Sequence, residues 1–193
     1  MKNILRPALV LFVALSVITG FLYPLAVTGV AQAAFPRQAN GSMIRGADGQ
    51  PVGSGLIGQA FADPLNFWGR PSATADKPYN ALASGGSNQG PLNPAFTDAV
   101  KARIQALRQA DPQQRAEVPV DLVTASASGL DPHISPAAAL YQVPRVAKAR
   151  GMAPEALEAL VLQHTDEPLL GFLGEARVNV LALNLALNGA PMH

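Results

Sequence analysis

The sequence contains no cysteine and few charged side chains. With Cys 0 among 193 residues, a disulfide framework, a thiolate zinc site, an iron–sulfur cluster and a cysteine nucleophile are excluded. Charged residues make up 14% of the chain, against about 25% in a typical soluble domain. They are scattered and form no basic tract, so we expect no nucleic-acid partner. Only His133, His164 and His193 are available as histidine ligands, which leaves little for a metal site.

Glycine and proline, by contrast, are abundant. The chain has 17 of each, which predicts many turns and short elements. An apolar fraction of 49% is sufficient for a packed core and argues against wholesale disorder. The length suits one domain of about 100–200 residues, alone or with an appendage.

The N-terminal part contains a long apolar run. No charged residue lies between Arg6 and Arg37, and about 20 apolar residues in a helix cross the hydrocarbon core of a bilayer. We therefore predict a single transmembrane helix, with Pro7 to Ala31 in the bilayer, inside an anchor of residues 1–35. Membrane helices tolerate a proline such as Pro24, usually with a kink.

The charges around this run predict its orientation. Lys2, Arg6 and the amino terminus precede the run closely, whereas the cationic residues after it lie further away. The positive-inside bias then predicts a cytoplasmic N-terminus. The soluble domain of residues 36–193 would lie on the other side of the membrane, as an extracytoplasmic domain.

A cleaved signal peptide is the alternative interpretation of the run. Ala31-Gln32-Ala33 fits the small-residue pattern of a cleavage site, and cleavage would leave a chain that begins at Ala34 or Phe35. The run is longer than the about 7–15 residues of a signal-peptide core, which favours the anchor. Both interpretations place the remaining chain outside the cytoplasm.

The soluble part shows the patterns of a small mixed α/β domain. Its clearest helix begins at Asn93-Pro94, a capping residue before a favoured first residue, and keeps apolar side chains on one face up to Ala110. Asp48-Gly49 between two short extended runs predicts a hairpin. The other expected elements are a strand at Val118–Thr124 and three helices: one opened by Ser135-Pro136, interrupted or kinked at Pro144 and ended by Gly151, one at Pro154–His164, and a buried one at Arg177–Asn188.

Residues 62–94 form a predicted loop that is rich in Pro, Gly, Asn and Ser. A structureless segment of that length in a compact domain is usually functional. Within it, Ser84–Asn88 (SGGSN) combines glycines, whose amides can face an anion, with side chains that can donate to phosphate or sugar oxygens. No GK[ST] follows, so it is not a Walker loop. A self-bonded loop or a partner-contact loop is the other interpretation.

Two further patterns have ordinary structural explanations. Gly53–Gly58 matches G-x-G-x-x-G, but Pro64 makes the helix that a dinucleotide site requires improbable, so we expect glycines in a strand or bulge. His164 beside Asp166 and Glu167 is explained as the end of a helix, because no complete metal ligand set is visible.

Asp131 and His133 lie among several serines, which suggests a Ser–His–Asp hydrolytic site. The spacing does not fix that geometry. A structured turn, with Ser135 as a helix cap, explains the same residues. Close to the start of the loop, Phe67-Trp68 beside Arg70 predicts either a stacking or docking anchor or a satellite core.

Together these blocks resemble the C subunits of the bacterial Kdp potassium-transporting P-type ATPases. The order and spacing of the blocks over nearly the whole chain carry the resemblance. In sequence they are the N-terminal membrane segment, Gly53–Phe61 (GSGLIGQAF), Phe67–Ala73 (FWGRPSA), Tyr79-Asn80, Ser84–Asn88 (SGGSN), Val120–Ser135 (VDLVTASASGLDPHIS), Tyr141–Arg150 (YQVPRVAKAR) and Gly171–Leu187 (GFLGEARVNVLALNLAL).

The resemblance implies an accessory, non-hydrolysing subunit of an ATP-driven, high-affinity potassium uptake pump in the inner membrane. Its partners would be an ATP-hydrolysing P-type subunit and a channel-like potassium subunit. The family is described as a catalytic chaperone that raises the ATP affinity of the P-type subunit. No cofactor of its own, metal or catalytic residue is expected, and ATP enters through the complex. The nucleotide-binding residues that the resemblance implies are Ser84, Gly85, Gly86, Ser87 and Asn88.

The predicted orientation conflicts with direct nucleotide contact, because an extracytoplasmic segment does not meet cytoplasmic ATP. Either the orientation is inverted, or the domain acts at the potassium entrance, or its effect is transmitted through the membrane subunits. We favour transmission, since an anchored domain can bias a pump's conformational equilibrium. The alternative function is a membrane-anchored extracytoplasmic hydrolase that uses His133, Asp131 and a nearby Ser.

Overall fold

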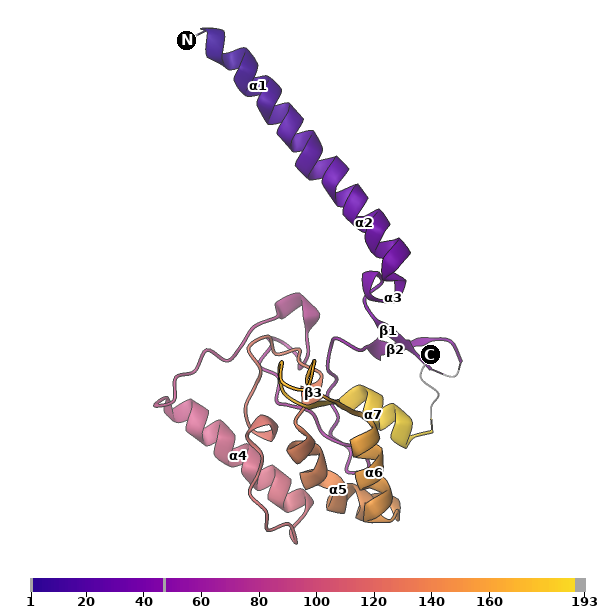
Figure 1. Ribbon diagram of the computed structural model, residues 1–193. Helices are drawn as coiled ribbons and strands as arrows, with labels where there is room; N and C mark the ends of the chain where they lie inside the picture. The colour runs from indigo at the N-terminus through magenta and orange to yellow at the C-terminus, as the bar shows by residue number, and fades with distance from the viewer. Residues whose placement is uncertain (1, 47, 190–193) are drawn as a thin grey trace. The chain divides into compact units, whose positions relative to one another are not determined.

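The computed structural model describes residues 2–46 and 48–189. The chain divides into two compact units, residues 1–43 and 44–193. In the first unit Figure 1 shows a long helical segment, and in the second it shows helices around short strands. The predicted anchor of residues 1–35 lies within the first unit.

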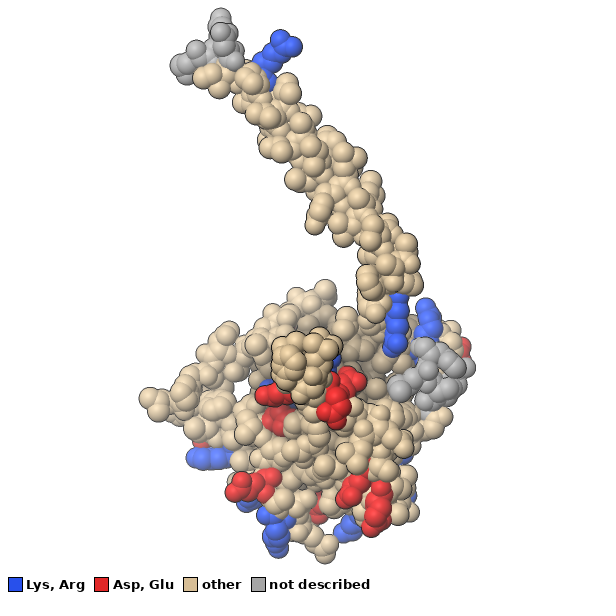
Figure 2. Space-filling model, viewed as in Figure 1, with Lys and Arg blue, Asp and Glu red and all other residues tan. Residues whose placement is uncertain are grey.

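The apolar run folds as one helical segment. It comprises α1 (Lys2–Val17), a π-helical turn η1 (Ile18–Leu22) and α2 (Tyr23–Ala34). Over Ile4–Ala34 the segment is long and apolar enough to cross a membrane, by length and composition. Figure 2 shows neither blue nor red side chains along its middle. A short helix, α3 (Pro36–Ala39), follows.

Pro24 is accommodated by the π-helical turn that precedes it. A proline has no N–H for the carbonyl four residues earlier, and its ring collides with that carbonyl in a regular α-helix. Here the Tyr23 N–H donates to the Ile18 carbonyl, five residues back, so the backbone is widened just before the proline. The run therefore continues through Pro24 into α2.

Within the part of the chain that the structure describes, the strands form two small antiparallel sheets. The first is the predicted hairpin, with β1 (Met43–Arg45) paired to β2 (Pro51–Ser54) across the turn that contains Asp48-Gly49. The second has the order β3-β5-β4. It comprises β3 (His133–Ile134), β4 (Thr165–Asp166) and β5 (Arg177–Asn179). The predicted mixture of helices and strands is thus confirmed.

The predicted helix signals are also confirmed. The Asn93 side chain accepts the Ala95 N–H at the start of α4, and the Ser135 side chain accepts the Ala138 N–H at the start of α5. Gly151 ends α5 in the left-handed conformation at φ 64°. The helices of the second unit are α4 (Pro94–Ala110), α5 (Pro136–Arg150), α6 (Pro154–Gln163) and α7 (Val180–Leu187).

The strand predicted at Val118–Thr124 is wrong. The segment forms a 3-10 turn, η3 (Val120–Leu122), in which the adjacent residues Leu122 and Val123 are both buried. A strand would place adjacent side chains on opposite faces. The Thr124 hydroxyl donates to the Val120 carbonyl and stabilises the turn instead. The alternation of apolar and polar residues in this segment therefore does not reflect a strand.

One helix boundary and one predicted interruption also differ from the prediction. The helix expected at Arg177–Asn188 begins three residues later, because Val178 pairs with both Ile134 and Thr165 in the sheet. The Asn179 side chain then caps α7 by accepting the Ala182 N–H. Pro144 lies inside α5 and does not interrupt it.

The core lies where α5, α6 and α7 meet β5. Residues 62–94 contain one 3-10 turn, η2 (Ala81–Ala83), and otherwise no helix or strand, as predicted. The most deeply buried large side chains are Phe67, Leu157, Leu183, Gln142, Val143, Val146, Val161, Val178 and Asn184. Two of these are amides and one, Phe67, comes from the loop. The long loop is therefore part of the core.

Candidate functional site

The segment Ser84–Asn88 lies beside the turn of residues 126–129. The Ser84 hydroxyl and the Gly85 N–H both donate to the Ser128 carbonyl, at 3.1 and 2.9 Å. Gly129 makes this approach feasible: a Cβ at that position would lie 2.8 Å from the Gly85 carbonyl oxygen. Two of the donors that an anion would use therefore hold the loop to the domain.

The sequence on both sides of this segment is uncharged. Residues 78–97 include no charged side chain, and Ser87 and Asn88 are exposed. The flanking Leu82 and Leu92 are 98% and 95% exposed. Phosphate sites usually combine cationic side chains with several converging amides. The segment has the exposure of a contact loop and lacks a cation of its own.

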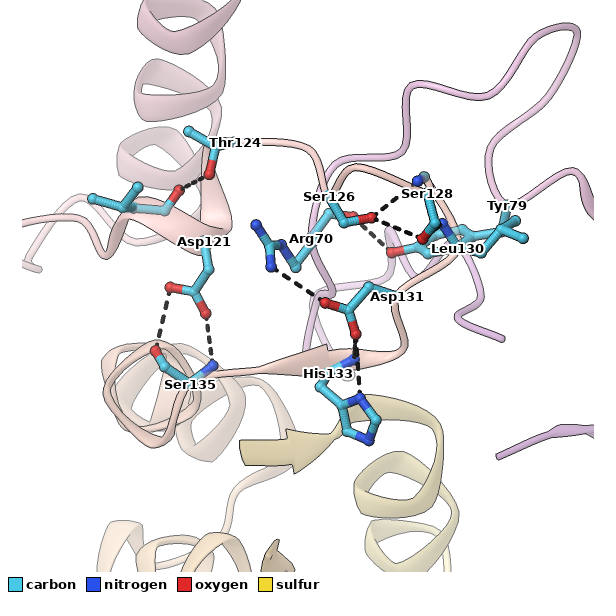
Figure 3. A network of polar contacts seen from close by, with 12 residues as sticks. Arg70, Tyr79, Asp121, Thr124, Ser126, Ser128, Leu130, Asp131, His133 and Ser135 are labelled. Carbon is cyan, nitrogen blue, oxygen red and sulfur yellow. Dashed lines mark hydrogen bonds and ion pairs between the residues drawn. The ribbon is translucent and has the colours of Figure 1, made fainter. Parts of the chain in front are cut away.

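Asp131 is the centre of a polar network in the same region (Figure 3). Its carboxylate accepts hydrogen bonds from Arg70 Nη1 at 3.2 Å and from the His133 main-chain N–H at 3.0 Å, and it lies 3.2 Å from His133 Nδ1. The hydrogen bond with the His133 side chain, more than any other contact, holds the pKa of Asp131 below its usual value. The network thus fixes the side chains of Arg70 and His133 around one carboxylate.

Tyr79 continues this network into the loop. Its hydroxyl donates to the Arg70 carbonyl at 2.6 Å, and its main-chain N–H donates to the Ser72 hydroxyl at 2.8 Å. Burial first, and then the charge of Asp131, raise the pKa of Tyr79 to about 12. A Cβ at Gly58 would collide with the Tyr79 ring, so close packing explains that glycine.

A cavity of about 570 Å³ adjoins the network and is rich in charged groups. Its lining includes Asp131 and His133, together with Arg177 at the start of β5 and Glu175 just before that strand. It is the place where the hydrolase hypothesis would require a serine nucleophile within reach of His133.

The serines of this region are engaged elsewhere. Three serine hydroxyls each accept a hydrogen bond from a main-chain N–H. Ser126 accepts that of Gly129 at 2.9 Å, Ser128 that of Leu130 at 3.1 Å, and Ser135 that of Ala138 at 3.0 Å. The Ser135 hydroxyl also donates to Asp121. Among the described residues, none of these hydroxyls bonds His133, so the structure supports the structured turn and assembles no triad.

His164 also has a local explanation. It follows α6, and its Nδ1 lies 3.0 Å from the Leu160 carbonyl oxygen of the preceding turn. Asp166, the neighbour considered as a ligand, pairs with Arg177 at 3.6 Å. Within residues 2–46 and 48–189, no three His, Asp or Glu side chains are grouped closely enough to hold a metal ion.

The aromatic pair of the loop is bound by polar side chains that the sequence analysis did not single out. The Asn184 amide bonds the main chain of Phe67, and the Gln142 amide bonds that of Trp68. Phe67 is fully buried and belongs to the main hydrophobic core, so it is neither a docking anchor nor part of a separate satellite core. For Asn184, the available signal was a single amide in an otherwise apolar helix.

Arg145 completes the attachment of the loop. Its guanidinium donates to the carbonyls of Pro64 and Asn66 at 2.6 and 3.0 Å, and to Gln142 Oε1 at 2.7 Å. It also lies 4.2 Å from the centre of the Trp68 ring. Burial lowers the pKa of Arg145 to about 10, which leaves the group charged at neutral pH. The Trp68 ring is thus covered by an arginine from α5, whereas the sequence analysis singled out its neighbour Arg70.

These features define a class of protein: a compact, loop-rich domain attached to one helix that is able to anchor it in a membrane. Its described polar residues hold the fold together and do not form a Ser–His–Asp triad. The comparisons with known proteins identify the family. A family model described as "KdpC: K+-transporting ATPase, c chain" matches residues 5–189.

Curated relatives agree with this match over almost their whole length. A protein of Polaromonas naphthalenivorans is 70% identical over 188 residues, which is 97% of this chain and 95% of the relative. One of Variovorax paradoxus is 68% identical over 190 residues, or 98% of each chain. One of Ralstonia nicotianae is 64% identical over 185 residues, or 96% and 90%. All three carry the name "Potassium-transporting ATPase KdpC subunit". The chain belongs to the KdpC family, and the predicted resemblance is confirmed.

Proposed function

We propose that this chain is the accessory, non-hydrolysing subunit of an ATP-driven, high-affinity potassium uptake pump. The carrying observation is the family match over residues 5–189, together with relatives of 60–70% identity that are named as KdpC subunits of potassium-transporting ATPases. Its partners are the ATP-hydrolysing P-type subunit and the channel-like potassium subunit of the same pump. Pro7 to Ala31 span the inner membrane once.

The domain faces the extracytoplasmic side in this proposal. Lys2 and Arg6 flank the N-terminal end of an otherwise uncharged helix, and the positive-inside bias retains such an end in the cytoplasm. The apolar segment Ile4–Ala34 is longer than a signal-peptide core, which favours a retained anchor.

The lack of native cysteine permits a direct test of this orientation. Single variants Gln113→Cys and Ser87→Cys place a thiol on exposed positions of the domain, and Asn3→Cys places one before the apolar run. In spheroplasts, a membrane-impermeant maleimide should label the first two and leave the third unlabelled until the membrane is opened. If the maleimide labels only Asn3→Cys in intact spheroplasts, the N-terminus faces outward and the proposed orientation is wrong.

The domain raises the ATP affinity of the P-type subunit by contact, as a catalytic chaperone. In this proposal the effect passes through the membrane subunits, because a domain that binds one pump conformation more tightly shifts the equilibrium toward it. Direct nucleotide binding at Ser84–Asn88 is the competing mechanism. The attachment of Ser84 and Gly85 to Ser128, and the absence of charge in residues 78–97, favour contact over direct binding.

A double variant separates these two mechanisms. Ser87→Ala with Asn88→Ala removes the exposed polar side chains of the segment and leaves Ser84 and Gly85, which bond Ser128, unchanged. In the purified pump, we expect the dependence of hydrolysis on ATP concentration to be unchanged. A rise of about tenfold in the apparent KM for ATP, with unaltered assembly, would establish the nucleotide site.

The hydrolase alternative requires His133 to activate a serine. The contacts of Ser126, Ser128 and Ser135 give no support to such a step. His133→Ala should leave potassium-limited growth at wild-type level. Loss of an esterase or amidase activity of the purified chain in this variant would favour the alternative.

A further inference from the structure

An apolar loop protrudes from the second unit between β4 and β5. This segment, Pro168–Gly174, is called the apolar tip here, and its sequence PLLGFLG contains no charge. The exposed fractions of Leu169, Leu170, Phe172 and Leu173 are 69%, 74%, 73% and 50%. Four large apolar side chains that are contiguous and exposed are unusual on a soluble surface and mark a contact site.

The backbone of the apolar tip is already folded. Leu169 and Leu173 exchange main-chain hydrogen bonds of 3.0 and 2.9 Å, and the turn between them passes through Leu170 and Gly171 at φ 58° and 79°. The tip stands on the β4–β5 pair, in which Val178 is fully buried. A preformed loop loses little conformational freedom on binding, so its apolar area is effective in recognition.

The base of the apolar tip carries negative charge. Asp166, Glu167, Glu175 and Arg177 line a cavity of about 450 Å³ together with Leu169 and Leu173. Arg177 pairs with Asp166 at 3.6 Å, whereas Glu167 and Glu175 have no ion pair among the described residues. The apolar surface is therefore bordered by two carboxylates that remain available to an external cation.

We propose that the apolar tip docks onto another subunit of the pump, in an apolar depression bordered by Lys or Arg. The inference rests on the proposed function, because it takes the chain to be a subunit. Leu170 and Phe172 supply the buried contact, and Glu167 and Glu175 select the orientation by charge complementarity. The same carboxylates disfavour a bilayer as the occupant, since anionic lipid headgroups repel them.

The test measures binding of the tagged, full-length chain to the pump subcomplex that lacks it, in mild detergent. Leu170→Ser with Phe172→Ser should raise the Kd about tenfold or more. Leu162→Ser is the matched control, since this α6 residue is 63% exposed but lies outside the tip. It should change the Kd less than about twofold. Glu167→Gln with Glu175→Gln should weaken binding severalfold and reduce its dependence on salt.

A cross-linker then identifies the occupant. Phe172→Cys can be labelled with a benzophenone maleimide at one position, because the chain has no other thiol. A photoadduct with another pump subunit supports the inference, and an adduct with lipid or with a second copy overturns it. If the wild-type chain binds and the tip variant binds equally well, the inference alone fails. If the wild-type chain does not bind the subcomplex, the proposed function fails as well.

Discussion

Asn184 binds both main-chain polar groups of Phe67. The Phe67 N–H donates to Asn184 Oδ1 at 2.8 Å, and Asn184 Nδ2 donates to the Phe67 carbonyl at 2.9 Å. Gln142 repeats the arrangement for Trp68, at 2.8 and 3.0 Å. Two amides from α7 and α5 thus bind the loop as a neighbouring strand would, in a place where no strand is available.

Removal of the first amide should destabilise the domain strongly. Asn184→Leu keeps the branched shape of the side chain but leaves the N–H and the carbonyl of Phe67 buried without partners. We expect a loss of about 2–6 kcal/mol in the free energy of unfolding, from about 1–3 kcal/mol for each of the two unsatisfied groups. Denaturant unfolding of the detergent-solubilised chain measures it. Asn188→Ala, at an exposed position, should cost less than about 1 kcal/mol, and equal losses in both variants would contradict the account.

Arg145→Lys should destabilise the domain and alter the environment of Trp68. A lysine keeps the charge but cannot donate at once to Pro64, Asn66 and Gln142 in the planar geometry of the guanidinium. We expect a loss of about 2–3 kcal/mol. Since Trp68 is the only tryptophan, a shift of the intrinsic fluorescence reports the change directly. Arg108→Lys, on the exposed face of α4, is the control and should leave the emission unchanged.

The sequence predicted the elements whose signals are local. Asn93, Ser135 and Gly151 mark helix ends through contacts within a few residues, and α4 and α5 have the predicted termini. The pairing of Asn184 with Phe67 spans 117 residues, and no local pattern records it. For the same reason the sheet partners of Val178 were missed and β5 was assigned to a helix. The individual polar groups around Asp131 were identified, but their contacts were not.

Gly129→Ala should disturb the loop that contains Ser84–Asn88. The new Cβ would meet the Gly85 carbonyl at 2.8 Å and the Thr74 side chain at 2.7 Å, at a φ of 67°. We expect a destabilisation of more than about 2 kcal/mol and faster hydrogen exchange at the Gly85 amide. Gly151→Ala is matched in φ, at 64°, but has no atom within 4 Å, so it should cost only about 1 kcal/mol. Equal effects of the two variants would show that Gly129 is not a packing position.

The Asp131 network should stabilise the domain in a pH-dependent manner. Because the folded-state pKa of Asp131 is lowered from 3.8, the stabilisation is complete above that value. It should be lost as the pH falls through the lowered folded pKa, since the folded state must then protonate a bonded carboxylate. Asp131→Asn should weaken the dependence of the free energy of unfolding on pH between about pH 5 and 2. If the variant loses stability at low pH as the wild-type chain does, groups other than Asp131 cause that loss.

The central claim is that this chain acts as a subunit, through contact with membrane partners. Its most direct test is affinity purification of the tagged, full-length protein in mild detergent from potassium-starved cells. We predict that a P-type ATPase subunit and a channel-like potassium subunit co-purify in a fixed ratio and that the assembly hydrolyses ATP. Recovery of the chain alone, with both pump subunits assembled and fully active in the flow-through, would contradict the account.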